Sequence, residues 1–108
     1  MSDEELLRYA AKAAGIVIKE WDYGEPVVDS TDGNYDFNWN PLADDGDALR
    51  LAVKLRMLVQ IRDTVTFVTD DDGKQLSYRP HKPHNGDPYA ATRRAIVRAA
   101  AEIGKEMK

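Results

Sequence analysis

The sequence predicts an α+β fold, an α/β/α sandwich in which helices pack on a mainly antiparallel sheet. Three segments combine helix start signals with apolar residues three or four positions apart, which is typical of amphipathic helices. Between them lie two blocks of short β-branched or aromatic segments bounded by turn residues. The expected order is α-β-β-β-α-β-β-β-α. A length of 108 residues suits one domain, covering residues 1–108.

The first helix is expected to follow Ser2 directly. Ser2 and Glu5 have the S-x-x-E spacing of a capping box, in which each side chain accepts a hydrogen bond from the backbone of the other residue. Gly15 is the residue type that most easily adopts the left-handed conformation found just beyond helix ends. The helix should therefore end at about residue 14.

The first block of strands is expected to begin at the β-branched residues 16–18 and to reach about residue 23, before the Gly-Glu-Pro break at 24–26. Asp32-Gly33 is a pair that tight hairpin turns favour, and it precedes the segment 35–40. Aromatic and polar residues alternate in that segment, so one face is aromatic. We expect this face in the core, because a small domain needs its aromatic side chains inside; facing outward, they would be able to stack on bases. The aromatic positions are Tyr35, Phe37 and Trp39.

A second helix is expected over residues 47–56, followed by strands at 58–62, 65–69 and 75–79 with a turn at 70–73. The apolar stripe of this helix is broad, which predicts that it is buried more deeply than the others. The stripe comprises Ala48, Leu49, Leu51, Ala52, Val53 and Leu55.

The third helix is expected to begin at Asp87-Pro88, since Asp caps helix N-termini and Pro favours the first helical position. The residues expected on its buried face are three, four or seven positions apart. They are Tyr89, Thr92, Ile96, Ala99 and Ile103.

Three segments resemble a family of small phage and prophage proteins, the phage ABA sandwich domain. They are the residues 39–52, which include Trp-Asn-Pro-Leu and Asp-Asp-Gly-Asp-Ala-Leu, the residues 86–95, and the opening residues 4–15. The resemblance implies helices on both faces of a sheet and an accessory gene of a phage or prophage. It implies no activity and no catalytic residues, so the candidate sites must come from the chain itself.

Charge is distributed unevenly along the chain. Residues 20–47 hold nine of the 19 acidic residues and none of the 15 Lys and Arg residues, whereas the rest of the chain is net basic. An acidic surface of this kind is complementary to the cationic groove of a nucleic-acid-binding protein. One hypothesis is therefore an acidic decoy that binds a host or phage protein, with Asp29, Asp32 and Asp36 as candidate binding residues.

The alternative is direct binding of nucleic acid through a basic face of the last helix. Arg93, Arg94 and Arg98 are the candidate residues, with Arg79 and Lys82 in the preceding segment. A solvated helix face is the simpler interpretation, because Glu102 follows Arg98 by four residues and can neutralise it.

No metal or other cofactor is expected. His81 and His84 would supply half of a metal site, completed by an Asp of the turn at 70–72, but a solvent-exposed loop is the favoured interpretation. The acids at 70–72 precede Gly73 in the manner of a polar hairpin turn, and residue 79, where a calcium loop needs Glu, is Arg. Asp44, Asp45 and Asp47 are expected to cap the second helix rather than to hold a cation.

The sequence carries no motif of an enzyme family. It lacks Cys, a Gly-x-Ser-x-Gly nucleophile and the glycine-rich phosphate loops, so a non-enzymatic protein is expected. The acidic start and the absence of a long apolar run predict neither a signal peptide nor a membrane span. The sequence therefore favours a cytoplasmic binding protein of a bacterial host, without fixing its partner or oligomeric state.

Overall fold

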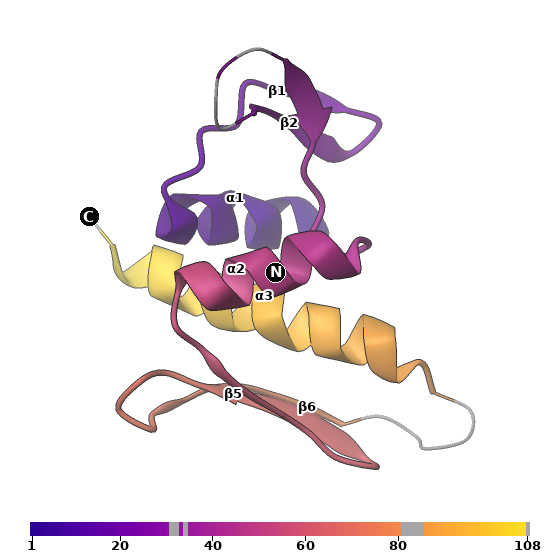
Figure 1. Cartoon of the computed structure of the whole chain (residues 1–108), viewed down its shortest axis with the longest axis vertical. Coiled ribbons are helices and arrows are strands. Elements are labelled where there is room, and N and C mark those ends of the chain that lie inside the picture. The colour runs from indigo at the N-terminus through magenta and orange to yellow at the C-terminus, as the bar shows by residue number, and fades with distance from the viewer. Residues whose placement is uncertain (31–32, 34, 81–85, 108) are drawn as a thin grey trace.

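The structure, a computed structural model, describes residues 1–30, 33, 35–80 and 86–107. These residues form three helices and six strands, and the strands pair into two separate antiparallel sheets. The helices make the middle layer and one sheet lies on each side of it (Figure 1). The helices are α1 (Asp3–Ala14), α2 (Asp45–Lys54) and α3 (Pro88–Glu106). Sheet A comprises β1 (Glu20–Asp22), β2 (Glu25–Asp29) and β3 (Asp36–Asn38), and sheet B comprises β4 (Leu58–Ile61), β5 (Val65–Thr69) and β6 (Gln75–Pro80).

The predicted α+β class, the order of elements and the antiparallel pairing are confirmed. The layering differs from a single sheet with helices on both faces. Each block of strands pairs only within itself, strand after strand, so two small sheets form in place of one large one. α2 connects the two blocks and belongs to the helix layer, so the chain crosses this layer between sheet A and sheet B (Figure 1). None of the described helices is long and apolar enough to span a membrane.

α1 and α3 form the centre of the molecule. The capping box of α1 is confirmed, because the Ser2 hydroxyl accepts the Glu5 amide at 3.2 Å and the Glu5 carboxylate accepts the Ser2 amide. Gly15 has a φ of 71° at the helix end, as predicted. Small residues allow the two helices to approach closely, and a Cβ built on Gly104 of α3 would lie 2.0 Å from the carbonyl oxygen of Tyr9. Buried alanines on the two helices include Ala10, Ala11, Ala14, Ala100 and Ala101.

The first strand starts later than the sequence predicts. Residues 16–18 are not part of a strand, and β1 begins at Glu20. The β1–β2 connection is a two-residue turn in which Tyr23 and Gly24 have φ of 50° and 81°. Pro26 belongs to β2 instead of ending a strand. The Pro26 carbonyl accepts a hydrogen bond from the Trp39 amide at 2.8 Å, but Pro26 has no N–H that could donate back to Trp39. β3 ends at Asn38, just before Trp39.

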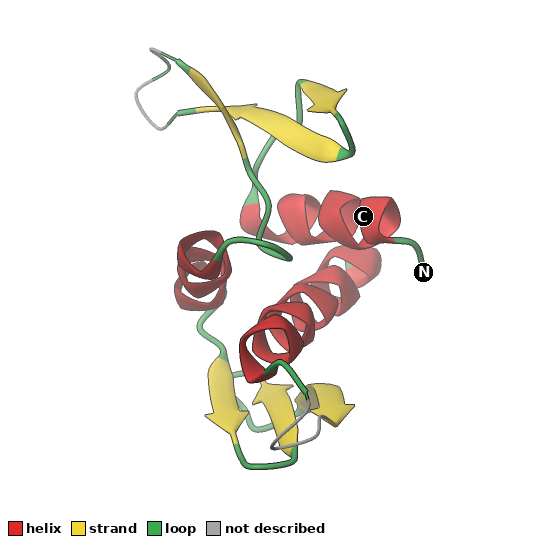
Figure 2. Ribbon diagram, turned by 90° about the vertical axis from the view of Figure 1, so that its right-hand side faces the viewer, coloured by secondary structure: helices red, strands yellow, loops and turns green. Residues whose placement is uncertain are grey.

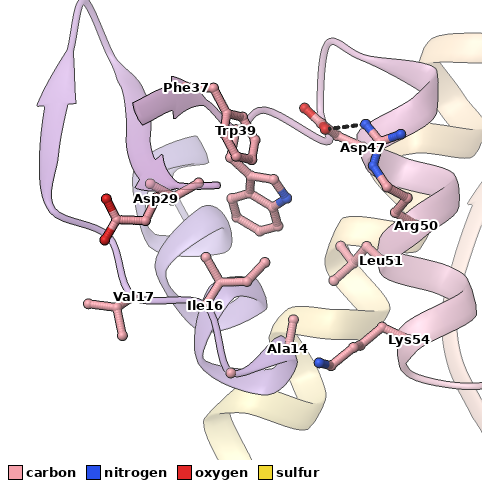
Figure 3. A pocket seen from close by; sticks show the side chains of 12 residues that line it. Ala14, Ile16, Val17, Asp29, Phe37, Trp39, Asp47, Arg50, Leu51 and Lys54 are labelled. Carbon is pink, nitrogen blue, oxygen red and sulfur yellow. Dashed lines mark hydrogen bonds and ion pairs between the residues drawn. The ribbon is translucent and has the colours of Figure 1, made fainter. Parts of the chain in front are cut away.

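The aromatic face of β3 is only partly in the core. Trp39 is 5% exposed, whereas Phe37 is 37% and Tyr35 is 62% exposed. Phe37 lies farther from the helices than Trp39, so only the end of the segment reaches the helix layer (Figure 3). The expected core position is therefore right for Trp39 and wrong for Tyr35. Of the predicted turn pair, Gly33 is described, and Asp32 lies outside the described residues.

Sheet B matches the predicted strands closely and packs on α3. Thr66 and Val68 of β5 are fully buried. The Ser77 hydroxyl on β6 donates to the carbonyl of Ala95 at 2.6 Å, and the hydroxyls of Thr66 and Thr92 are 3.2 Å apart. These side chains therefore join the sheet to the helix by polar contacts as well as by apolar packing.

Two predictions of buried side chains, one on α2 and one on α3, are wrong. α2 begins after Asp44, whose carboxylate accepts the Asp47 amide at 2.8 Å, so it starts two residues before the predicted position and also ends earlier. Leu49 and Val53 are 64% and 69% exposed, because α2 meets the core along only one side. On α3, Tyr89 is 69% exposed although its spacing predicted burial. The other residues of the predicted α3 face, Thr92, Ile96, Ala99 and Ile103, are buried or half-buried.

Candidate functional site

Two of the predicted binding acids share one lysine within the fold. Asp29 and Asp36 are cross-strand partners on β2 and β3, and Lys19 Nζ lies 3.1 Å from Asp29 Oδ1 and 2.9 Å from Asp36 Oδ1. The hydrogen bond from Lys19 lowers the pKa of Asp36. The bonds to Asp36 and Asp29 raise the pKa of Lys19. Lys19 lies just before the stretch that lacks bases, so a count along the sequence misses this ion pairing.

The acids around the start of α2 are also paired. Arg50 Nη2 lies 2.7 Å from Asp47 Oδ1 and 3.8 Å from Asp44 Oδ2, and Arg93 Nη1 lies 2.7 Å from Asp45 Oδ1. Asp47 is nearly buried and also accepts the backbone amide of residue 40 at 3.0 Å. Five of the nine acids in residues 20–47 thus meet three bases from outside the stretch, so the charge asymmetry of the sequence is compensated in part.

The described acids of the stretch without an ion pair lie on β1 and β2. Asp22 and Glu25 are neighbours at the β1–β2 turn, and the side-chain amide of Asn38 bonds to both, at 3.4 and 3.3 Å. Glu20 is exposed on the same hairpin. This small group is the part of the predicted acidic surface that stays open, and the third candidate acid, Asp32, lies outside the described residues.

Two of the three candidate arginines hold helices together. Arg93 Nε donates to the carbonyl of Leu42 at 2.9 Å, in addition to its ion pair with α2, and its side chain is 17% exposed. Arg94 Nη2 lies 3.0 Å from Asp3 Oδ1 and joins α3 to the start of α1. Arg98 is exposed and has no ion pair within the described part of the chain. A phosphate would therefore find one free arginine on α3 rather than a set of three.

The structure offers no described metal site. His81, Lys82 and His84 lie outside the described residues, and among the described ones no three His, Cys, Asp or Glu are grouped so that they could hold a metal ion. Asp70 has the turn role that the sequence predicts. Its Oδ1 accepts the amides of Asp72 and Lys74, each at 2.9 Å.

The feature that the sequence interpretation missed is an apolar groove between α2, α3 and β4. Its volume is about 480 Å³, within the range of binding pockets. Three large apolar side chains on its lining are well exposed: Leu49 at 64%, Ile61 at 61% and Tyr89 at 69%. An exposed apolar patch of this kind is a common mark of a protein-binding surface. Ala48, Ala52, Val59, Pro88 and Ile96 complete its apolar lining.

One wall of the groove is the free edge of sheet B. β4 pairs with β5 and has no other strand beside it among the described residues. The Arg62 amide donates to Val65 at 2.8 Å, so by antiparallel alternation the residues 58 and 60 also direct their backbone groups toward β5. The backbone N–H and C=O groups of Val59 and Ile61 therefore point outward. Figure 2 shows sheet B below the helix layer, on the side opposite to sheet A.

Basic residues surround this edge. Arg56 comes just before β4 and Arg62 just after it, and both are exposed. Neither forms an ion pair within residues 1–30, 33, 35–80 and 86–107. β4 itself carries no charge that would protect the edge, unlike most exposed edge strands. Positive charge at both ends of an apolar edge favours a segment with acidic residues.

Comparison with known proteins gives no relative: no family model, no curated protein and no solved structure matches the chain. The site therefore has to be interpreted from its own geometry.

Proposed function

We propose that this protein is a small, non-enzymatic binding protein whose groove accepts an extended segment of a partner protein. The segment adds a strand beside β4 and places alternate apolar side chains in the groove between α2 and α3. The observation that carries this proposal is the coincidence of an apolar groove with outward-pointing backbone groups on the same strand.

Each feature supplies a different part of the binding. Hydrogen bonds to Val59 and Ile61 supply orientation that does not depend on the sequence of the partner. The exposed side chains of Leu49 and Tyr89 supply apolar contact on the helix side. Arg56 and Arg62 favour a segment that carries Asp or Glu beside its apolar residues.

Selection from a random peptide library displayed on a carrier, with the intact protein as bait, tests the proposal. We expect enriched peptides to alternate apolar residues and to contain acidic ones. Amide hydrogen exchange should slow at Val59 and Ile61 when a selected peptide binds, because their amides then have acceptors. Size-exclusion chromatography with light scattering, run without peptide, measures the mass in solution. A dimer mass would indicate that a second copy of the chain already occupies the edge at β4.

Two matched variants locate the binding surface. Tyr89→Ser removes an exposed aromatic ring from the groove, and Tyr23→Ser removes a fully exposed ring from the β1–β2 turn. We expect only Tyr89→Ser to weaken the selected peptides. The proposal is wrong if no peptide is enriched, if Tyr23→Ser has the larger effect, or if the protein is a dimer through β4.

The origin and partner predicted from the sequence stay proposals beside this one. The resemblance to phage ABA sandwich proteins would make the chain a phage or prophage accessory protein and its partner a host or phage protein. The acidic decoy hypothesis has less support than the groove, because most of its acids are paired. The nucleic-acid alternative is supported on α3 by Arg98 alone among the three candidates.

A further inference from the structure

A second cavity lies on the other side of the helix layer, between sheet A and α2. Its volume is about 500 Å³, which is enough for a small organic ligand. Figure 3 shows it from close by, with Trp39 and Phe37 of the β3 segment on one side and the side chains of α2 on the other. Ile16, Val28 and Leu51 complete an apolar interior.

The wall formed by Trp39 contains a hydrogen-bond donor without a partner. The residue is 5% exposed, yet no described residue accepts a hydrogen bond from its indole Nε1. This nitrogen faces the α2 side of the cavity (Figure 3). The nitrogen itself is open to solvent, since Thr69 Oγ1 is the one buried side-chain N or O atom without a partner among the described residues. The indole N–H can therefore donate to a ligand in the cavity.

The α2 wall is basic. Arg50 and Lys54 are four residues apart and so lie on the same face of the helix. Arg50 bonds to Asp47 with one nitrogen and keeps other N–H groups for a ligand. Lys54 forms no hydrogen bond or ion pair with any residue that the structure describes, and Figure 3 shows its ammonium group directed toward Ala14 across the cavity.

The two acids that line the cavity, Asp29 and Asp47, form ion pairs with bases other than Lys54. Asp47 is bonded to Arg50, and Asp29 is bonded to Lys19. Lys54 is therefore the one base of this lining without an ion pair among the described residues, and it lies beside an apolar, aromatic interior.

We propose that this cavity binds a small organic anion with an apolar or aromatic body. The body lies against Trp39 and Ile16, an acceptor atom takes the indole N–H, and the acidic group faces Arg50 and Lys54. This site is separate from the groove at β4 and does not depend on the proposed function, because α2 presents different faces to the two.

A pair of isosteric probes tests the proposal: 2-naphthoate, which is an anion, and 2-naphthamide, which is neutral. Both are titrated into the intact protein, and the indole N–H signals of the two tryptophans are followed by nuclear magnetic resonance. We expect the Trp39 signal to move and the Trp21 signal to stay, with tighter binding of the anion. Trp39→Phe serves to assign the signals and should weaken both probes, since it keeps a ring but removes the donor.

Lys54→Met isolates the charge. This side chain is exposed, so the variant should fold, and we expect its affinity for naphthoate to fall about two- to fivefold while its affinity for naphthamide stays the same. Lys74→Met, at the distant β5–β6 turn, is the matched control and should leave the affinities for both probes unchanged. The proposal is overturned if neither probe moves the Trp39 signal, if Lys54→Met weakens both probes equally, or if Tyr89→Ser in the groove removes the binding.

Discussion

At the scale of single residues, Gly104 determines how closely α1 and α3 approach. A Cβ at this position would lie 2.0 Å from the oxygen and 2.7 Å from the carbonyl carbon of Tyr9, and backbone atoms cannot rotate away. We expect Gly104→Ala to lower the free energy of unfolding by about 2 kcal/mol, although alanine favours helices elsewhere. Urea unfolding measures this change.

Gly46 provides the matched control for that substitution. It lies in the first turn of α2, and its added Cβ would meet Arg50 nitrogens and an Asp44 oxygen at 3.2 Å. These atoms belong to flexible side chains that can shift, so Gly46→Ala should be close to neutral. If both variants unfold at the same urea concentration as the original protein, the close helix contact is not a constraint on stability.

The ion pairs of Lys19 should make the stability of the fold depend on pH. The lowered pKa of Asp36 means that its ion pair stabilises the fold above the ordinary pKa of aspartate and is lost as the pH falls through the lowered value. The raised pKa of Lys19 means that its contribution is present below the ordinary pKa of lysine and is lost as the pH rises through the raised value. We therefore expect Lys19→Met to lower the Tm near neutral pH and to have little effect in strong acid.

A titration of the Asp36 carboxyl by nuclear magnetic resonance checks the cause. In Lys19→Met its pKa should return toward the ordinary value for aspartate, because the largest lowering contact is gone. Lys74→Met should leave it unchanged. If the Asp36 pKa is the same in the original protein, in Lys19→Met and in Lys74→Met, the ion pair between Lys19 and Asp36 is contradicted.

At the scale of elements, the β1–β2 turn has a residue that does not suit it. Positive φ at both central positions matches the turn type that favours Asn-Gly, but the first position is Tyr23, which is fully exposed and packs on nothing. Tyr23→Asn should therefore raise the free energy of unfolding by up to about 1 kcal/mol. Urea unfolding tests this, and a lower stability of the variant would show that the ring has a role in the fold.

Elements whose signals are local were predicted best. The capping box at Ser2, the Asp87-Pro88 start of α3 and the strands of sheet B depend on residues close together in sequence, and the structure confirms them. The aromatic alternation around β3 and the broad stripe of α2 correctly predicted which side of each element is apolar. They did not predict how much of that side is buried. Periodicity identifies which side is apolar, whereas burial depends on what covers that side, and nothing described covers Leu49 or Tyr35.

The candidate sites were harder to predict than the elements, because their contacts are distant in sequence. Arg93 meets Asp45 and Arg94 meets Asp3, 48 and 91 residues away, so the basic face seen in the helix sequence is partly used inside the molecule. The groove and the cavity also combine segments that no motif connects. Only the exposed apolar positions of α2, taken with an uncharged edge strand, could have indicated the groove from the sequence.

At the scale of the whole molecule, the two sheets differ in how firmly they are attached. Sheet B has buried Thr66, Val68 and Ser77 against α3. Sheet A has no buried residue in β1 or β3, stands across a cavity of about 500 Å³ from α2, and is connected to the helix layer through residues 15–19 and 39–44 (Figure 2). Three strands with so little buried surface are barely stable alone.

We therefore expect sheet A to open without the rest of the molecule. Native-state hydrogen exchange should give the amides of β2 a smaller opening free energy than those of β5 and α3. Two matched variants separate local from global opening, because Val28 in β2 and Val68 in β5 are both buried. Val28→Ala should lower the opening free energy of β2 while β5 keeps its own, and Val68→Ala should lower that of the whole molecule by about 2 kcal/mol. If both variants lower the protection of β2 and β5 by equal amounts, the molecule unfolds as one unit and sheet A is as firmly held as sheet B.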